Sequence, residues 1–418
     1  MSFCTKSTLT PEMLALQHKG IPLTNPEIKV AVFRSIDEVT SDWETAQPAD
    51  NCFLHRDYLK VVETTPSIKI TFRYLIFYKN NFPCGVAFCP LYHYKTKESI
   101  KELREEMTTF KLSTWIKQKL ASPLNFNLLI VGNNLLTGEH GFYFNENYIS
   151  DSECIPLIDE AIKTLSACLK NDGTKVHGYF IKDLHEWREE GRAYLDERKF
   201  HDFTFNPNMF LPIRPEWGNY DGYLAAMTSK ARTRLKKARK SINSLEVREL
   251  NAQQIDVLLP EIFHLFSNVA DRVAFNMVQL KPEYFLDLKR ELGDKFKLYG
   301  YFDPNVEGGK LVAFHTAFAK GKEYDAHFLG FEPSYNHTHK LYLNVLLNLV
   351  EEGIELNAEQ IIFSRTAMEI KSSVGAEPEN LHGYVRACNG FINWFLGRIV
   401  SYFEPKDEWQ QRRPFKES

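Results

Sequence analysis

The second half of the chain alternates between segments with the two-residue apolar period of strands and segments with the 3.6-residue period of helices. The order from residue 223 is helix, strand, two helices, three strands, helix, strand, short helix, strand and terminal helix. The predicted segments are 223–241, 245–250, 252–270, 282–292, 296–302, 311–320, 323–331, 340–352, 360–364, 366–373, 382–387 and 391–403. Pro260 predicts a break in the third segment, and Gly353 predicts the end of the helix at 340–352.

The first half repeats this order more faintly. Its predicted strands and helices lie at 28–33, 72–78, 84–94, 128–132, 155–169, 177–182, 186–197 and 202–212. Two units of similar length and element order indicate an internal duplication. We therefore divide the chain into an extension at 1–25, a first unit at 26–215, a second unit at 216–403 and a tail at 404–418.

A charged, helix-prone excursion at 95–121 interrupts the first unit. Acids and bases are mixed along it, which favours a solvated helical arm against the edge of a sheet. A lid or a peripheral membrane contact is the alternative.

Composition excludes several classes of protein. The net charge is −3, so the surface as a whole does not indicate nucleic-acid binding. The seven cysteines are scattered and none has the spacing of a zinc site, so we expect reduced thiols and no metal. No apolar run reaches the ~18 residues of a spanning helix, and the start of the chain has no signal-peptide pattern. We expect a cytoplasmic protein without an integral membrane segment.

The element order resembles the GNAT superfamily of acyl-CoA N-acyltransferases, and its tandem use resembles the Fem family of aminoacyltransferases. Three stretches carry the likeness: the basic segment 230–240, the turn 369–375 with its Lys371-x-x-x-Gly375, and the stretch 129–142. The resemblance implies an α+β fold of tandem GNAT-like domains, each a mixed, mostly antiparallel sheet flanked by helices. It also implies that the second domain is active and the first is degenerate.

A polar segment before the helix at 340–352 predicts a site for donor phosphates. Segment 334–340, SYNHTHK, reads as a loop that opens onto a helix N-terminus, where free N–H groups bind anions. His337, His339, Lys340 and Tyr335 would contact the phosphates. GNAT domains have glycines in this loop and this chain has none, so the donor stays open between acyl-CoA and aminoacyl-tRNA.

Four residues are candidates for the chemistry of acyl transfer. Asp325 and His327 share one face of a predicted strand, and His315 lies on the strand before it. Any of these can accept a proton from an amine, although a histidine in a sheet is more often structural. Lys371 could place an ammonium beside a carbonyl or a phosphate and so stabilise charge, and the Fem resemblance implies that the matching lysine lies in the active-site region. The alternative for Lys371 is a surface lysine paired with Glu369 or Glu377.

The segment 230–240 holds seven basic residues and no acid, which predicts an anion-binding surface. Successive turns place Lys230, Arg234 and Lys237 on one side, toward phosphates of a nucleotide, tRNA or lipid. A solvated helix face is the alternative. Asp271 and Arg272 follow the predicted helix at 252–270, where GNAT folds meet the acceptor.

The resemblance implies an N-acyltransferase that uses an acyl-CoA-like donor and a small-molecule or envelope-precursor amine as acceptor. A Fem-type aminoacyl-tRNA-dependent transferase acting on a cell-wall precursor is a second reading. A GNAT-like scaffold that binds without catalysis is a third, because a fold alone does not establish an activity.

Overall fold

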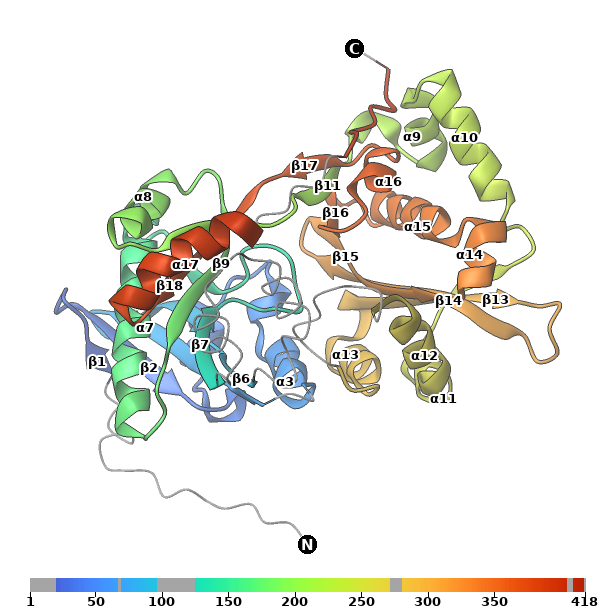
Figure 1. Cartoon of the computed structure of the whole chain (residues 1–418). Helices are drawn as coiled ribbons and strands as arrows, with labels where there is room; N and C mark the ends of the chain where they lie inside the picture. Colours follow the sequence, from blue (N-terminus) through green and yellow to red (C-terminus); the bar gives the residue numbers. More distant parts are fainter. Residues whose placement is uncertain (1–19, 67–68, 96–124, 271–279, 404–408, 417–418) are drawn as a thin grey trace, which may run out of the picture.

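The computed structural model of the chain describes residues 20–66, 69–95, 125–270, 280–403 and 409–416. The described strands form three sheets of five, six and seven strands. Figure 1 shows two units side by side, one around the first two sheets and one around the third. The excursion beyond Lys95, most of the predicted extension, and Asp271 and Arg272 lie outside the described residues.

The first unit contains two sheets. In spatial order, the five-stranded sheet consists of β1 (Ile21–Pro22), β2 (Ile28–Phe33), β4 (Tyr74–Lys79), β5 (Phe82–Phe88) and β8 (Phe142–Phe144). The six-stranded sheet consists of β10 (His201–Thr204), β18 (Leu381–Ala387), β9 (Gly178–His185), β7 (Asn125–Val131), β6 (Leu91–Lys95) and β3 (Ile70–Thr71). The helices of this unit are α2 (Asp42–Ala46), α3 (Arg56–Thr64), α7 (Asp151–Asn171) and α8 (Glu189–Glu197).

The third sheet organises the second unit. Its strands, in spatial order, are β12 (Glu246–Glu249), β13 (Phe296–Asp303), β14 (Lys310–Lys320), β15 (Glu323–Phe331), β16 (Gln360–Ser364), β11 (Asn208–Pro212) and β17 (Glu377–Glu379). Figure 1 shows α11 (Ala252–Val257), α12 (Leu259–Ala270) and α13 (Tyr284–Leu292) on one face of β13–β15 and α15 (Leu341–Glu355) on the other. The second unit also contains α9 (Tyr220–Ala226), α10 (Ser229–Lys240), α14 (Pro333–His339) and α16 (Met368–Ser372). The last helix, α17 (Gly390–Phe403), contacts β10 and β18 of the second sheet.

Both units contain the same β-α-β element with parallel strands. In the first unit β7 pairs with β9 and α7 lies between them in the chain; in the second, β15 pairs with β16 across α15. The parallel pairing ends at Ile181 and at Ile362. Two residues later, Asp183 and Ser364 both adopt a positive φ, of 61° and 63°. The predicted internal duplication is therefore visible in the backbone at this point.

The two units exchange strands. β11 precedes the predicted boundary at 215 but pairs with β16 and β17 in the third sheet. β18 lies late in the chain but pairs with β9 and β10 in the second sheet. A predicted single strand at 202–212 is instead β10 and β11, which belong to different sheets. The division of the chain at 215 stays a prediction.

Three further element predictions need correction. The segment 223–241 is two helices, because Met227 is extended and Thr228 caps α10 with its side chain. The segment 84–94 divides at Cys89–Pro90 into β5 and β6. α15 continues past Gly353, which is buried against Ile361 and leaves no room for a larger side chain.

The units share a core at their boundary. Phe53 of the first unit contacts Phe318 of β14 with ring centroids 4.9 Å apart, and Tyr58 of α3 lies 5.8 Å from the same ring. This cluster faces the Asp325 side of the third sheet, because Phe318 pairs directly with Asp325. Among the described residues, no helix is long and apolar enough to cross a membrane.

Candidate active site at the seam between the units

A buried cluster of charged side chains lies where β9 and β16 end. Asp183 is fully buried, and its carboxylate accepts hydrogen bonds from Lys182 beside it and from Arg365 of the second unit. The backbone N–H of Gly138 donates to the same carboxylate at 3.0 Å. Burial alone would raise the pKa of Asp183, but the two cations outweigh it and lower the pKa. Asp183 therefore stays ionised and joins the two units.

Lys371 lies beside this cluster and is only 3% exposed. Its Nζ donates to the carbonyl oxygen of Ser364 at 3.2 Å, and the Ser364 hydroxyl is 2.7 Å from that of Thr137 in the first unit. Burial lowers the pKa of Lys371 to about 7. Among the described residues no carboxylate forms an ion pair with Lys371, because Glu369 pairs with Arg412 instead. The surface-lysine alternative is therefore wrong.

The C-terminal tail fixes the turn around Lys371. Gly375 has a φ of 100°, and a Cβ there would lie 2.3 Å from the ring of Phe415. The backbone N–H of Arg412 donates to Ser372 Oγ at 2.9 Å. Only glycine fits both the backbone conformation and the close contact at 375. The tail thus packs on the second unit.

Asp325 and His327 lie on the face of β15 that meets the first unit. Burial raises the pKa of Asp325 to about 7, and Lys320 Nζ is 3.9 Å from its carboxylate. His327 Nε2 lies 2.8 Å from the hydroxyl of Tyr284. Burial among aromatic rings lowers the pKa of His327 to about 3, so the imidazole is neutral near pH 7. Of the two, Asp325 has the basicity that suits proton transfer near neutral pH.

His315 lies on the opposite face of the sheet. Its Nδ1 is 3.1 Å from the Tyr301 hydroxyl and its Nε2 is 3.2 Å from Glu352 of α15. The ring is buried and stacks on Tyr299. The structure therefore separates His315 from Asp325 and His327. Its surroundings agree with the alternative that His315 is a buried sheet histidine bonded to its neighbours.

The predicted phosphate loop is a helix. Residues 333–339 form α14, and Lys340 adopts a left-handed conformation with a φ of 48° before α15 begins. The side-chain oxygen of Asn336 already accepts the N–H of Tyr342 at 3.0 Å. This bond occupies a backbone N–H in the first turn of α15, where the sequence predicted donors for an anion. The prediction of an open loop was wrong.

The side chains at α14 also differ from the prediction. Tyr335 donates to Asp303 at 2.8 Å and stacks on His339. His339 Nδ1 lies 2.7 Å from the Thr338 hydroxyl, whereas His337 and Lys340 are exposed. An acid, Asp303, thus lies among the residues predicted to bind phosphate, and it disfavours an anion there.

The basic helix α10 is exposed as predicted. Lys230, Arg234 and Lys237 are all exposed, and within the described part of the chain none of them forms an ion pair. Arg239 of the same helix is the contrast, since it pairs with Glu351 of α15. Unpaired cations on one helix raise the local potential for anions.

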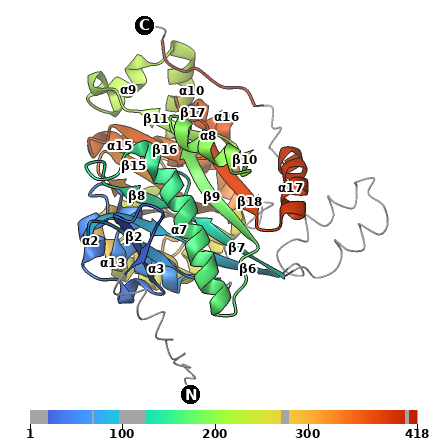
Figure 2. The same cartoon turned by 90° about the vertical axis from the view of Figure 1, so that its left-hand side faces the viewer.

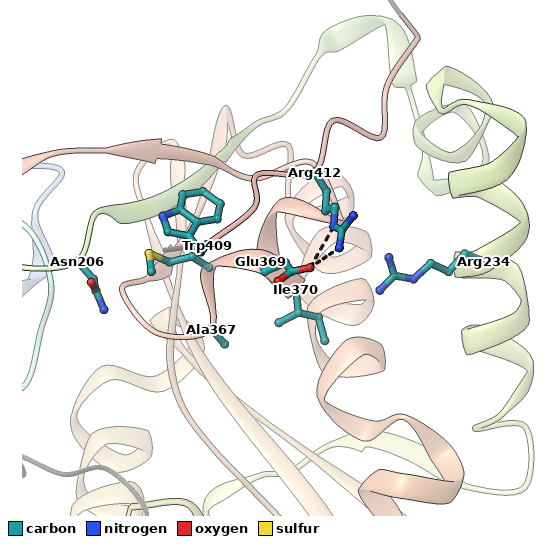
Figure 3. A pocket seen from close by; sticks show the side chains of 8 residues that line it. Asn206, Arg234, Ala367, Glu369, Ile370, Trp409 and Arg412 are labelled. Atoms are coloured by element: carbon teal, nitrogen blue, oxygen red, sulfur yellow. Dashed lines mark hydrogen bonds and ion pairs between the residues drawn. The ribbon is translucent and has the colours of Figure 1, made fainter. Parts of the chain in front are cut away.

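A pocket of about 490 Å³ lies between α10 and α16, on the outer side of the helix that carries Lys371. In Figure 3, Arg234 extends toward the pocket from α10, and the Glu369–Arg412 ion pair lies opposite it. The pocket is lined by Asn206, Arg234, Ala367, Met368, Glu369, Ile370, Trp409 and Arg412. It therefore combines an aromatic ring with two guanidinium groups close to Lys371.

Comparison with solved structures identifies the fold. No model of a known protein family matches the chain, and no curated protein matches it. The crystal structure of FemX aligns over 88% of this chain and 99% of its own, with a TM-score of 0.52 and 11% identity. The chain has the FemX fold. The predicted α+β, tandem GNAT-like and Fem-like architecture is confirmed.

Two further solved structures align at lower TM-scores. A tandem GNAT protein from the clavulanic acid biosynthesis pathway aligns over 87% of this chain and 99% of its own, at 9% identity and a TM-score of 0.49. The C-terminal domain of a putative lysylphosphatidylglycerol synthetase from Agrobacterium fabrum aligns over 88% of this chain and 95% of its own, at 9% identity and a TM-score of 0.45.

Sequence reasoning missed several residues of the seam in this FemX-like fold. Each of the missed residues is a charged residue that ends or directly follows an apolar strand, and this position is the one sequence signal that could have identified them. They are Lys182, Asp183, Lys320 and Arg365. Their meeting depends on the docking of the two units. Among the described residues, no group of three or more histidines, cysteines or carboxylates could hold a metal ion.

Proposed function

We propose that this protein is an N-acyltransferase that joins an activated acyl group to a primary amine at the seam between its units. The buried Lys371, which has no counter-ion among the described residues, is the observation that carries the proposal. A buried ammonium that lacks a carboxylate is able to stabilise a developing oxyanion, because its field is not already neutralised.

In this proposal Asp325 and Lys371 both act beside β16. Asp325 of β15 lies opposite Ile362 of β16 in the register of the two parallel strands. Lys371 donates a hydrogen bond to the backbone carbonyl of Ser364, which lies two residues further along β16. Two residues of a strand span roughly 7 Å. The ionised carboxylate of Asp325 accepts the proton of the acceptor ammonium, and the neutral amine then attacks the acyl carbonyl. A C–N bond forms, the bond from the carbonyl to the donor breaks, and the leaving group takes up a proton.

The donor that the charges favour is an acyl ester on a polyanion such as aminoacyl-tRNA. The support is the set of unpaired cations on α10 beside the pocket near Lys371. Acyl-CoA, which the GNAT resemblance implies, finds no glycine loop before α15. An envelope-precursor amine remains the acceptor class that the Fem resemblance implies.

Binding of the two donor classes tests the proposal. We would measure the thermal stability and binding of the whole protein with acetyl-CoA, free CoA and bulk tRNA. The test variant is Lys230→Glu with Lys237→Glu on α10. The matched control is Lys60→Glu with Lys310→Glu, which changes the net charge equally at two exposed lysines away from α10.

We expect tRNA to bind and the α10 variant to lose at least tenfold in affinity, while the control changes less than threefold. Stabilisation by CoA or acetyl-CoA without tRNA binding would overturn the donor class and leave the N-acyltransferase reading. If none of the three ligands binds, the non-catalytic scaffold becomes the better reading.

A further inference from the structure

The terminal helix α17 turns an aromatic face to the solvent. Phe391, Ile392, Trp394 and Phe395 are 72%, 57%, 56% and 39% exposed. Their spacing of one, three and four residues places them on one side of the helix. Large apolar side chains gathered on one exposed face mark an interaction surface, whereas single exposed ones do not.

The opposite side of α17 is held to the sheet by a polar side chain. Asn393 is buried; its Oδ1 accepts from the N–H of Ala387 at 2.8 Å, and its Nδ2 donates to the carbonyl of Lys199 at 2.9 Å. The His201 ring lies 2.8 Å from the Asn393 carbonyl. These bonds fix the rotation of the helix, so the polar anchor faces the protein and the aromatic side chains face out. A helix of a globular protein usually has the reverse arrangement.

Basic side chains lie on this helix and on the segments beside it. No acid occurs from residue 380 to 403, although the chain holds 54 aspartates and glutamates. The guanidinium of Arg398 lies 4.3 Å from the centre of the Trp394 ring, at the edge of the aromatic face. Lys199 is exposed next to the Asn393 anchor, and Arg386 lies on the strand before the helix. The surface is therefore complementary to an anionic partner.

We propose that α17 docks the protein on an anionic lipid bilayer, with Phe391, Ile392, Trp394 and Phe395 in the boundary between headgroups and acyl chains. The helix has 14 residues, or roughly 21 Å at 1.5 Å per residue, which is too short to cross the ~30 Å hydrocarbon core. Tryptophan and phenylalanine with an arginine at their edge suit the bilayer interface, where the rings are half immersed and the cation reaches phosphate.

The position of α17 in the molecule agrees with docking. It contacts β10 and β18 and lies on the outside of the first unit in both views (Figures 1 and 2). The pocket beside α16 belongs to the second unit. Docking through α17 therefore leaves the proposed catalytic seam and α10 uncovered, and it is independent of the proposed reaction.

Flotation of the whole protein with lipid vesicles tests this inference. The vesicles are phosphatidylcholine alone, or phosphatidylcholine with roughly 30 mol% phosphatidylglycerol, whose anionic headgroups attract basic side chains. The test variant is Trp394→Ser with Phe391→Ser. The matched control is Trp187→Ser, since Trp187 is 59% exposed and also has an arginine, Arg188, over its ring.

We expect wild type and Trp187→Ser to float with the anionic vesicles, and the α17 variant to bind at least tenfold more weakly. Arg398→Glu should reduce binding to anionic vesicles and hardly change binding to neutral ones. The melting temperature and circular dichroism of each variant establish that it is folded.

Two results would overturn the proposal. One is equal binding, or no binding, of wild type and the folded α17 variant on both vesicles. The other is a wild-type dimer in solution that the α17 variant converts to monomer without any lipid binding, which would assign the face to a second copy of the chain.

Discussion

At the scale of single residues, Lys371 shows how much a side chain's chemistry depends on its surroundings. The Lys371-x-x-x-Gly375 spacing made it a candidate, with a surface ion pair as the alternative. In the structure it is buried, bonded to a carbonyl, and its pKa falls to about 7. The sequence was enough to select Lys371 as a candidate. The burial that lowers its pKa comes from residues far away in the chain.

The pKa of Lys371 predicts a pH-dependent stability. Its folded-state pKa of about 7 lies below the ordinary 10.5, so between these values the unfolded chain binds a proton that the native state lacks. The contribution of Lys371 to the free energy of unfolding therefore rises from pH 7 to pH 10.5. Below pH 7 both states are charged, and the full cost of burying the ammonium is present.

Lys371→Met should thus stabilise the protein most at low pH. At about 1.4 kcal/mol per pKa unit, the gain at pH 6 is on the order of a few kcal/mol and shrinks toward pH 10. Melting temperatures at pH 6, 8 and 10 measure it, with Lys310→Met as an exposed control. A difference that is the same at all three pH values would contradict the assigned pKa. Acyl-transfer activity of the variant should be lost.

The surroundings of the three sheet residues predicted as bases, Asp325, His327 and His315, also depend on how the units pack. Alternation along β15 correctly places Asp325 and His327 on one face, and that face meets the first unit. His315 differs because it lies on the other face, with Tyr301 and Glu352. Periodicity orders residues within a strand, but it does not show which face borders the other unit.

At the scale of elements, one glycine determines how closely α12 approaches β15. A Cβ on Gly330 would lie 2.4 Å from the backbone carbon of Leu265. Backbone atoms cannot move aside as a flexible side chain can, so a larger residue must displace the helix.

Gly330→Ala should therefore lower the free energy of unfolding by about 1–3 kcal/mol. Gly390→Ala is the matched control, because a Cβ there has no heavy atom within 4 Å, and its effect should stay within about 0.5 kcal/mol. Urea denaturation measures both. Equal midpoints for the two variants would show that the α12–β15 contact is looser than described.

At the scale of the whole molecule, the exchange of β11 and β18 makes the two units dependent on each other. Each strand is paired on both sides within the sheet of the other unit. Cutting the chain at 215 removes an interior strand from each sheet and exposes the unpaired edges of its neighbours.

Separate fragments 20–215 and 216–418 should accordingly fail to fold alone. We expect neither to show a cooperative thermal transition by circular dichroism, and we expect mixing or co-expression to restore one. The intact chain is the control and should unfold in a transition that includes both units. A sharp transition in either isolated fragment would show that the exchanged strand is dispensable.

Local pattern in the sequence determined most of the elements. The apolar periods predicted β2, β13–β16 and α11–α13 near their observed limits, and the hairpin at Gly321 and the break at Pro260 followed from turn and proline chemistry. These features depend on neighbours in sequence, so a single chain is enough to specify them. The GNAT and Fem resemblance rested on this same order.

Tertiary structure alone decided how those elements meet. Two findings depend on contacts between residues distant in the chain: β10 and β11 separate into different sheets, and Asp183 pairs with Arg365 across the seam. The desolvation of Lys371 and Asp325 has the same origin, because burial is a property of the packed units. The sequence therefore determined the elements and named several candidate groups, and long-range packing decided which of them share a site.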